Sequence, residues 1–340
     1  MPSDAILSWL LEPDNPPVRL MALTHLLSRE PADPEVQATR SALMDYSVTR
    51  GILDHIDEIW ASTPRQALSF RGKLWSTVFL GHFRADRSDP RLKKELRGLA
   101  DVDWPKTIFP CMAACMLRAL GRLGFANHGP VVQGIETLAA GIVSGPGVAC
   151  RCTAPSLLSH CYMSLPKLLL CLAETPAESR SATVQEAIAW ITEELISHQV
   201  YVYVPGNQKA WHAVRPKSRK KADAPAGETP ASWVAKEKAQ FLKEHGPGEP
   251  QPKTGWTKFG FPLNYNSDIL EAMLALALAD VPMDARLEEP LRILADKETA
   301  DGKWVMEKSL NGQMWADVET KGEPSKWLTL FASLVLDHFG

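Results

Sequence analysis

A carboxyl at the start of an apolar stretch is the feature of this sequence best suited to chemistry. Asp268 lies three residues after Tyr265 and three before Glu271, and residues 269–279 are almost all apolar. A stretch without a polar stripe predicts a helix that is buried on every side. Burial raises the pKa of a carboxyl, so Asp268 is a candidate general acid or base, and Tyr265 could hold or relay its proton. The structural alternative is that Asp268 only caps or binds backbone, with Ser267 as the N-cap.

A group of cysteines beside a histidine is the second candidate for chemistry. Cys152, His160 and Cys161 could supply a catalytic thiol or a Cys–His pair. With Cys150 they place four soft ligands within twelve residues, which is compatible with tetrahedral zinc. Free cysteines are also common as small core residues, and packing is the favoured alternative here. We therefore expect no cofactor, and a zinc site at Cys150, Cys152, His160 and Cys161 is the less favoured alternative.

Four cations recur in the first turn of predicted apolar helices. They are Arg19, Lys73, Lys167 and Lys326. If these helices run parallel, their first turns meet at one mouth, where helix amino termini and cations together suit a carboxylate, phosphate or diphosphate. The alternative is that the four side chains face solvent and pair with acidic residues such as Glu12, Glu307 or Glu319.

Tryptophan is abundant, with 11 in the chain. Four of these tryptophans are candidates to line an apolar cavity for a substrate: Trp75, Trp256, Trp315 and Trp327. Packing in the core is the alternative for each of them.

The elements that must position these residues alternate between amphipathic outer helices and wholly apolar inner helices. The inner helices are expected to start near residues 17, 72, 110, 166, 262 and 325, with Pro262 as the start of the fifth. Six outer–inner hairpins predict an all-α fold, an (α/α)6 barrel or toroid that forms a single domain over residues 1–340. The spacing of the hairpins is uneven, as in a degenerate repeat.

The largest gap between inner helices contains an insertion. Residues 215–252 are rich in Pro, Gly, Lys and Glu, and we expect them to form a mobile excursion that carries one short helix, 231–244. The basic run at 215–221 could bind an anionic partner, although a solvated loop is the favoured interpretation. If the insertion instead docks as a lid over the cavity, Trp211, His212 and Trp233 join the site.

Several short motifs resemble those of the squalene cyclase and prenyltransferase superfamily. Glu298-x-x-x-Gly302-x-Trp304 is similar to the family's Q-x-x-x-G-x-W repeat, with Glu in place of Gln, and the segment before Cys150 looks like a degraded D-G-G-W-x-C. The resemblance implies a free-standing single toroid. The family's class II cyclases protonate their substrate with D-x-D-D, whereas this chain has only Asp101-Val102-Asp103-Trp104. The resemblance therefore supports the fold more than the chemistry.

Composition limits the classes of protein to which the chain can belong. The 340 residues are 45% hydrophobic and 23% charged, with a net charge of −3. A near-neutral balance argues against nucleic-acid binding, and no apolar run reaches the length of a membrane span. Six cysteines without a secretory pattern at the amino terminus are expected to be reduced thiols in the cytoplasm. The sequence makes no prediction of oligomeric state.

These observations favour an enzyme whose cavity binds a small, mostly apolar molecule. We expect acid–base lyase, isomerase or cyclisation chemistry on a terpenoid-like or aromatic substrate that carries an anionic group at one end. A hydrolase is the alternative, because Asp103 or Asp101 could pair with Asp268 across the cavity. A non-catalytic ligand carrier or scaffold is the remaining alternative, and it would have an unbroken apolar lining.

Overall fold

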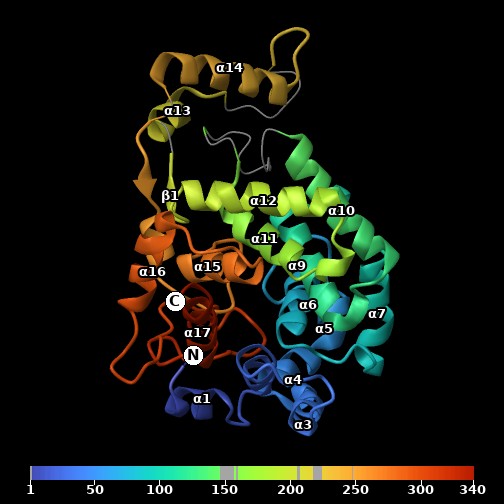
Figure 1. Ribbon diagram of the computed structural model, residues 1–340. Coiled ribbons are helices and arrows are strands. Elements are labelled where there is room, and N and C mark those ends of the chain that lie inside the picture. The colour runs from blue at the N-terminus through green and yellow to red at the C-terminus, as the bar shows by residue number, and fades with distance from the viewer. Residues whose placement is uncertain (1, 146–156, 158–159, 205–206, 217–223, 247) are drawn as a thin grey trace.

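Helices are the predominant secondary structure in the part of the chain that the structure describes (Figure 1). The computed structural model describes residues 2–145, 157, 160–204, 207–216, 224–246 and 248–340. Within these residues, sheet is limited to one antiparallel pair, β1 (Val202–Tyr203) with β2 (Gln251–Pro252). The all-α prediction is therefore confirmed. None of the described helices has the length and apolar composition needed to cross a bilayer.

The inner helices match the predicted apolar stretches. They are α2 (Pro16–Met21), continued by the π-helical turn η1 (Ala22–Leu26), α6 (Lys73–His82), α9 (Pro110–Leu120), α11 (Leu165–Ala173), α15 (Ile269–Leu278) and α17 (Lys326–Phe339). Every residue of α11 is buried, as expected for a helix that other helices surround. From α6 onward, each inner helix packs on the next one along the chain: α6 on α9, α9 on α11, α11 on α15, and α15 on α17. The last inner helix, α17, also packs on the first, α2.

Close packing between neighbouring inner helices depends on small residues. A Cβ on Gly81 would lie 2.7 Å from the Cβ of Ala119, so the glycine allows α6 and α9 to approach closely. The main hydrophobic core runs through all six inner helices and includes Phe79, Leu169 and Met273. The core is thus built from the stretches whose apolar residues cover every face.

The outer helices cover this core with one apolar face each. They are α1 (Asp4–Leu10), α3 (Pro34–Ala42), α4 (Ser47–Leu53), α5 (Ile56–Trp60), α7 (Pro90–Ala100), α8 (Trp104–Thr107), α10 (Gly129–Ser144), α12 (Ala182–Ser197) and α16 (Glu288–Ala295). In α7, Leu92, Leu96 and Leu99 are buried at helical spacing, and the Asp89 carboxylate caps the first turn. Outer helices pack on inner ones, as α7 does on α9 and α16 does on α15.

The start of the fifth inner helix differs from the prediction. Pro262 follows a cis peptide bond in an irregular segment, and α15 begins seven residues later at Ile269. The N-cap is Asp268 rather than Ser267, because the Asp268 side chain accepts the backbone N–H of Glu271. A proline without an N–H suits an irregular segment as well as a first helical turn, so its presence alone did not fix the start.

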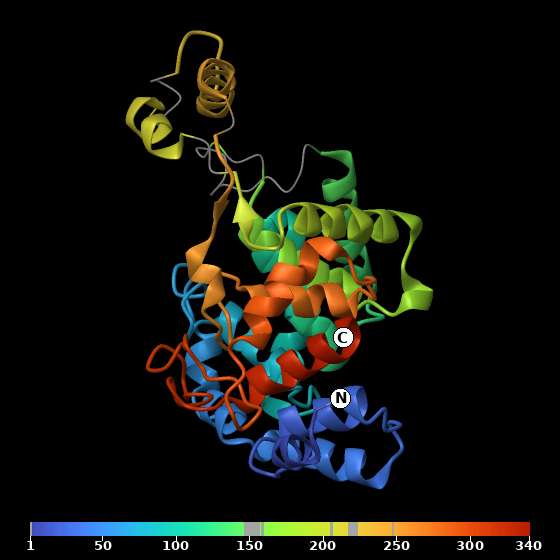
Figure 2. The same cartoon turned by 60° about the vertical axis from the view of Figure 1, so that its left-hand side comes forward.

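Residues 215–252 contain one helix in the described part of the chain, α14 (Pro230–His245), which confirms the helix expected at 231–244, and a shorter helix, α13 (Gln208–Val214), lies just before that range. Figure 2 shows both helices standing apart from the rest of the molecule, joined to it through β1 and β2. Leu157, Trp211 and Phe241 form a small cluster of their own, outside the main core. Trp211 belongs to that cluster. Among the described residues, Trp211, His212 and Trp233 line neither the cavities among the inner helices nor those at the carboxyl ends of these helices.

Excision of the insertion is expected to leave the main body folded. Tyr203 lies opposite Gln251 in the β1–β2 pair, so an Asn-Gly turn can join them in place of residues 204–250. No described residue of that range belongs to the main core. We expect the shortened chain to unfold within about 5 °C of the full chain in a thermal scan followed by circular dichroism. A decrease of more than about 10 °C would show that the insertion stabilises the body.

Candidate functional site

Two adjoining cavities lie among the inner helices. Their volumes are about 20 and 30 Å³, and both are lined by His82, Arg118, Arg122, Leu263 and Glu271. Spaces of this size hold one or two water molecules. The lining combines ionisable groups with apolar side chains, rather than the unbroken apolar surface expected of a simple carrier. We call these two spaces the central cavity.

Asp268 lines the central cavity from the start of α15. Its side chain is almost fully buried, with 1% of the residue exposed. Burial raises its pKa to about 7, the charge of Glu271 contributes in the same direction, and backbone N–H groups and Lys308 oppose the shift. The opposing hydrogen bonds come from the N–H of Glu271 at 2.8 Å and of Gly260 at 3.2 Å. A carboxyl with this pKa can donate or accept a proton near neutral pH.

Glu271 forms a buried ion pair one turn along the same helix. Its two carboxylate oxygens accept hydrogen bonds from Lys167 Nζ at 3.1 and 3.0 Å, and the Ser267 hydroxyl donates to the same carboxylate. Burial opposes the charge on Lys167, but the Glu271 carboxylate more than offsets this effect, so the pKa of Lys167 is raised. The pair joins α11 to α15 and places fixed charges beside Asp268.

Two arginines on α9 and the turn after it form the other polar wall. Arg118 and Arg122 both donate to the Glu174 carboxylate, with the shortest contact of each at 2.6 Å. Burial acts to raise the pKa of Glu174, but the two guanidinium groups hold it well below its ordinary value. Arg122 also donates to Nδ1 of His82 at 3.2 Å. Burial, followed by the charges of Arg122 and Arg118, keeps the pKa of His82 well below its ordinary value, so this imidazole is neutral.

Tyr265 is not joined to Asp268 in the structure. Its hydroxyl accepts a hydrogen bond from Trp75 Nε1 at 3.0 Å and donates to the Leu68 carbonyl at 3.3 Å. Trp75 lines the central cavity, and its role in substrate binding remains a prediction. A proton relay from Asp268 to Tyr265 would therefore require Tyr265 to exchange these partners.

His160 and Cys161 lie in a different part of the molecule, beside the carboxyl end of α12. His160 Nε2 is 2.7 Å from the Glu194 carboxylate, and the Tyr162 hydroxyl donates to His198 Nε2 at 2.7 Å. The hydrogen bond from His160 lowers the pKa of Glu194. Both His160 and Cys161 are buried. Cys150 and Cys152 lie outside the described residues, so the proposed zinc site and the role of Cys152 remain predictions.

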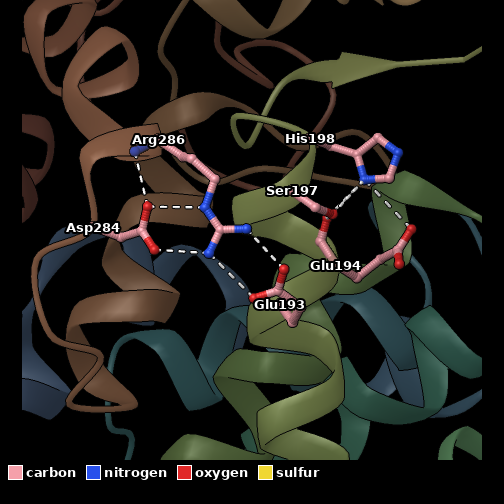
Figure 3. Close-up of polar contacts among 6 residues, drawn as sticks. All are labelled: Glu193, Glu194, Ser197, His198, Asp284 and Arg286. Atoms are coloured by element: carbon pink, nitrogen blue, oxygen red, sulfur yellow. Dashed lines mark hydrogen bonds and ion pairs between the residues drawn. The ribbon is translucent and has the colours of Figure 1, made fainter.

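Ion pairs hold the end of α12 in place beside this group (Figure 3). Arg286 pairs with Glu193 at 2.8 Å and with Asp284 at 2.7 Å, which ties α12 to the segment before α16. On the neighbouring face of the helix, His198 Nδ1 lies 3.5 Å from the Glu194 carboxylate. The position of Glu194, and with it that of His160, is therefore set by contacts on both sides of α12.

The four predicted anion-binding cations each pair with a carboxylate of the chain. The pairs are Arg19 with Glu35 at 2.6 Å, Lys73 with Glu95 at 3.6 Å, Lys167 with Glu271 at 3.0 Å, and Lys326 with Glu12 at 2.7 Å. Of the four, Lys167 alone lines the central cavity. Pairing reduces the positive charge that these residues can offer a ligand.

The remaining predicted site residues lie away from the central cavity. Asp103 is exposed, caps α8 and pairs with Lys106 at 2.8 Å, so the structure does not place it across a cavity from Asp268. Trp256 and Trp327 are buried in the main core, and Trp327 stacks on Phe261. Trp315 stacks on the ring of His55 with 4.1 Å between ring centroids. Their roles as substrate-binding residues remain predictions.

Sequence reasoning missed the arginine wall and the partner of Lys167. The missed residues are His82, Arg118, Arg122, Glu174 and Glu271, the last having been noted only as a neighbour of Asp268. A usable signal was present, because Cys115, Arg118 and Arg122 recur at helical spacing on an otherwise apolar helix. Charged residues on such a helix must find buried partners or line a cavity.

The chemistry of this site has to be argued from its geometry. No family model matches the chain, and neither does any curated protein or solved structure. The central cavity combines a carboxyl titrating near neutral pH, a neutral imidazole and paired fixed charges, with apolar walls formed by Leu274, Leu328 and Phe331. Such a combination suits proton transfer to or from a small molecule.

Proposed function

We propose that the chain is an enzyme that performs acid–base chemistry on a small, mostly apolar molecule, with Asp268 as the catalytic acid or base. The observation that carries the proposal is the position of Asp268, a buried carboxyl with a pKa of about 7 that lines a cavity. Lyase, isomerase and cyclisation reactions all need such a group, because each moves a proton to or from a weakly acidic or basic carbon centre.

The proposal includes a toroidal arrangement of the inner helices around that cavity. Contacts between successive inner helices from α6 to α17, and between α17 and α2, support it, as does a turn in the segment that links α16 to α17. In this turn Gly302 has a left-handed backbone, with φ of 74°, and Trp304 donates its indole N–H to the Leu294 carbonyl. The turn thus uses the glycine and tryptophan that carry the resemblance to the cyclase repeats.

Each group around Asp268 has a role in the proposed reaction. Burial and the nearby charge of Glu271, which pairs with Lys167, oppose ionisation of Asp268, so a substantial fraction of Asp268 stays protonated near neutral pH. Leu274, Leu328 and Phe331 form the apolar wall against which a hydrocarbon group packs. The guanidinium groups of Arg118 and Arg122 then face the anionic end of the molecule.

Access to the cavity requires a movement of the chain. A cavity of about 30 Å³ does not hold a terpenoid or an aromatic ring. Leu263 contributes to both parts of the cavity and is only partly buried. We propose that displacement of residues 261–266 opens the cavity, since this irregular segment precedes α15 and belongs to no helix.

The experiment that tests the proposal is a substrate screen with paired proteins. Wild type and Asp268→Asn are incubated with a panel of acyclic and cyclic terpenoids and aromatic acids, and products are detected by mass spectrometry and by proton NMR in D₂O. Conversion, or exchange of substrate protons with solvent, by wild type but not by the variant supports acid–base catalysis. Equal conversion by both proteins removes Asp268 from the mechanism.

A further inference from the structure

A second and larger group of cavities lies at the carboxyl ends of the inner helices. Two spaces, of about 540 and 290 Å³, share the lining residues His25, Arg84 and Arg122. The ends of η1, α9 and α11 all contribute lining residues, as does the segment after α6. We call these two spaces the arginine cavity. Arg118 and Arg122 line both the arginine cavity and the central cavity, so these two side chains lie between the two.

The arginine cavity carries an excess of positive charge. Its lining contains five arginines and two glutamates: Arg29, Arg40, Arg84, Arg118, Arg122, Glu30 and Glu174. Arg118 and Arg122 share Glu174, and Arg29 pairs with Asp33 at 3.3 Å. In the described part of the chain, neither Arg40 nor Arg84 has an ion pair or a side-chain hydrogen bond. The guanidinium groups of these two arginines therefore have no carboxylate partner in the described part of the chain.

Arg84 is the more unusual of these two unpaired cations, because it is partly buried whereas Arg40 is exposed. Burial lowers its pKa; Glu174 opposes the shift, whereas the nearby charges of Arg118 and Arg40 add to it. A cation withdrawn from water without a contacting carboxylate is costly, and a bound anion would offset that cost. Carboxyl-terminal helix dipoles stabilise cations here, but their effect is confined to the last helical turn.

Two helix endings contribute residues to the wall of the larger space. Arg84 and Ser28 both adopt left-handed conformations, with φ of 56° and 50°, and both line the larger space. Both residues follow the C-cap of a helix, Leu27 after η1 and Phe83 after α6, where a left-handed residue commonly ends a helix. Thr24 and Ser28 supply hydroxyl groups to the same wall.

We propose that the arginine cavity binds the phosphate group of a small phosphorylated molecule. Two unmatched guanidinium groups balance a phosphate dianion, and each can donate two parallel N–H groups to its oxygens. A space of 540 Å³ lies within the range of small-molecule sites, so the remainder of a phosphate monoester has room beside the phosphate. This site does not depend on catalysis by Asp268, because the two groups line different cavities.

Isothermal titration calorimetry at constant ionic strength tests the site, with inorganic phosphate and the monoester phenyl phosphate as probes. We expect wild type to bind both, and Arg84→Gln and Arg40→Gln each to raise the dissociation constant at least about tenfold. Arg97→Gln is the matched control, since Arg97 is exposed, lies 3.6 Å from Asp101 and lines neither cavity. Tighter binding of phenyl phosphate identifies an organic phosphate as the ligand, whereas equal binding identifies free phosphate.

Two results would contradict phosphate binding at this site. Absence of binding to wild type up to about 10 mM, or dissociation constants that neither arginine substitution changes, would overturn the proposal. Arg40 is exposed, so Arg40→Gln remains informative even if Arg84→Gln does not fold. Asp268→Asn is expected to bind phosphate as wild type does, which separates this site from the proposed enzymatic function.

Discussion

Asp268→Asn is expected to lower turnover by at least about 100-fold, the usual effect of removing a general acid or base. Asparagine preserves the shape of the side chain and can still accept the N–H of Glu271, but it cannot exchange a proton. Its amide group would face the N–H of Gly260, which now donates to the carboxylate. Because two donors would then meet, we expect a loss of about 1–3 kcal/mol in the free energy of unfolding, and a folded protein.

The control for this variant is Asp103→Asn. Asp103 is also an N-cap, of α8, but it is exposed and pairs with Lys106 at the surface. We expect its turnover to equal that of wild type. Initial rates are measured with whichever substrate the screen identifies, after circular dichroism has shown that both variants are folded. Unchanged turnover in folded Asp268→Asn would reduce Asp268 to a structural cap.

Glu174→Gln is expected to cause the largest loss of stability, about 3–5 kcal/mol in the free energy of unfolding. The Arg118 and Arg122 side chains are only 11% and 7% exposed, and Glu174 is the carboxylate that pairs with both. Burial and the charge of Arg118 already lower the pKa of Arg122 to about 10. Without the carboxylate, two like charges would remain beside each other, and each would keep only limited access to water.

Urea denaturation measures this effect, and two further variants identify its cause. Adding Arg122→Gln to Glu174→Gln removes one uncompensated charge and should recover part of the loss. Glu289→Gln removes a carboxylate from a surface pair with Arg292 and should leave the denaturation midpoint unchanged. A loss below about 1 kcal/mol in Glu174→Gln would contradict the buried-charge explanation.

The inner helices could be predicted because burial on every side leaves a simple signature, an apolar stretch without a polar stripe. Where proline occupies the first turn, as Pro110 does in α9, the predicted start agrees with the structure. The prediction was wrong at Pro262, because an irregular segment also tolerates a residue without an N–H. The proposed closure of the helices into a ring would depend on long-range packing, which no local pattern specifies.

The site was only partly predictable for a related reason. Burial of Asp268 followed from the apolar stretch that it precedes, and the direction of its pKa shift followed from burial. The partners of Tyr265 and Lys167 did not follow, because Leu68 and Glu271 lie 197 and 104 residues away along the chain. A cation in a first helical turn looks the same in a sequence whether it binds a ligand or a distant carboxylate.

The protonation of Asp268 is the central claim, and an NMR titration of its carboxyl carbon tests it most directly. The protein is labelled with ¹³C at aspartate side chains, and Asp268→Asn identifies the Asp268 signal by its disappearance. Glu319 is also expected to titrate near pH 7, and labelling aspartate alone keeps its signal out of the spectrum. We expect the Asp268 signal to titrate with a pKa of about 7. A midpoint near 4, the ordinary value for aspartate, would contradict the account.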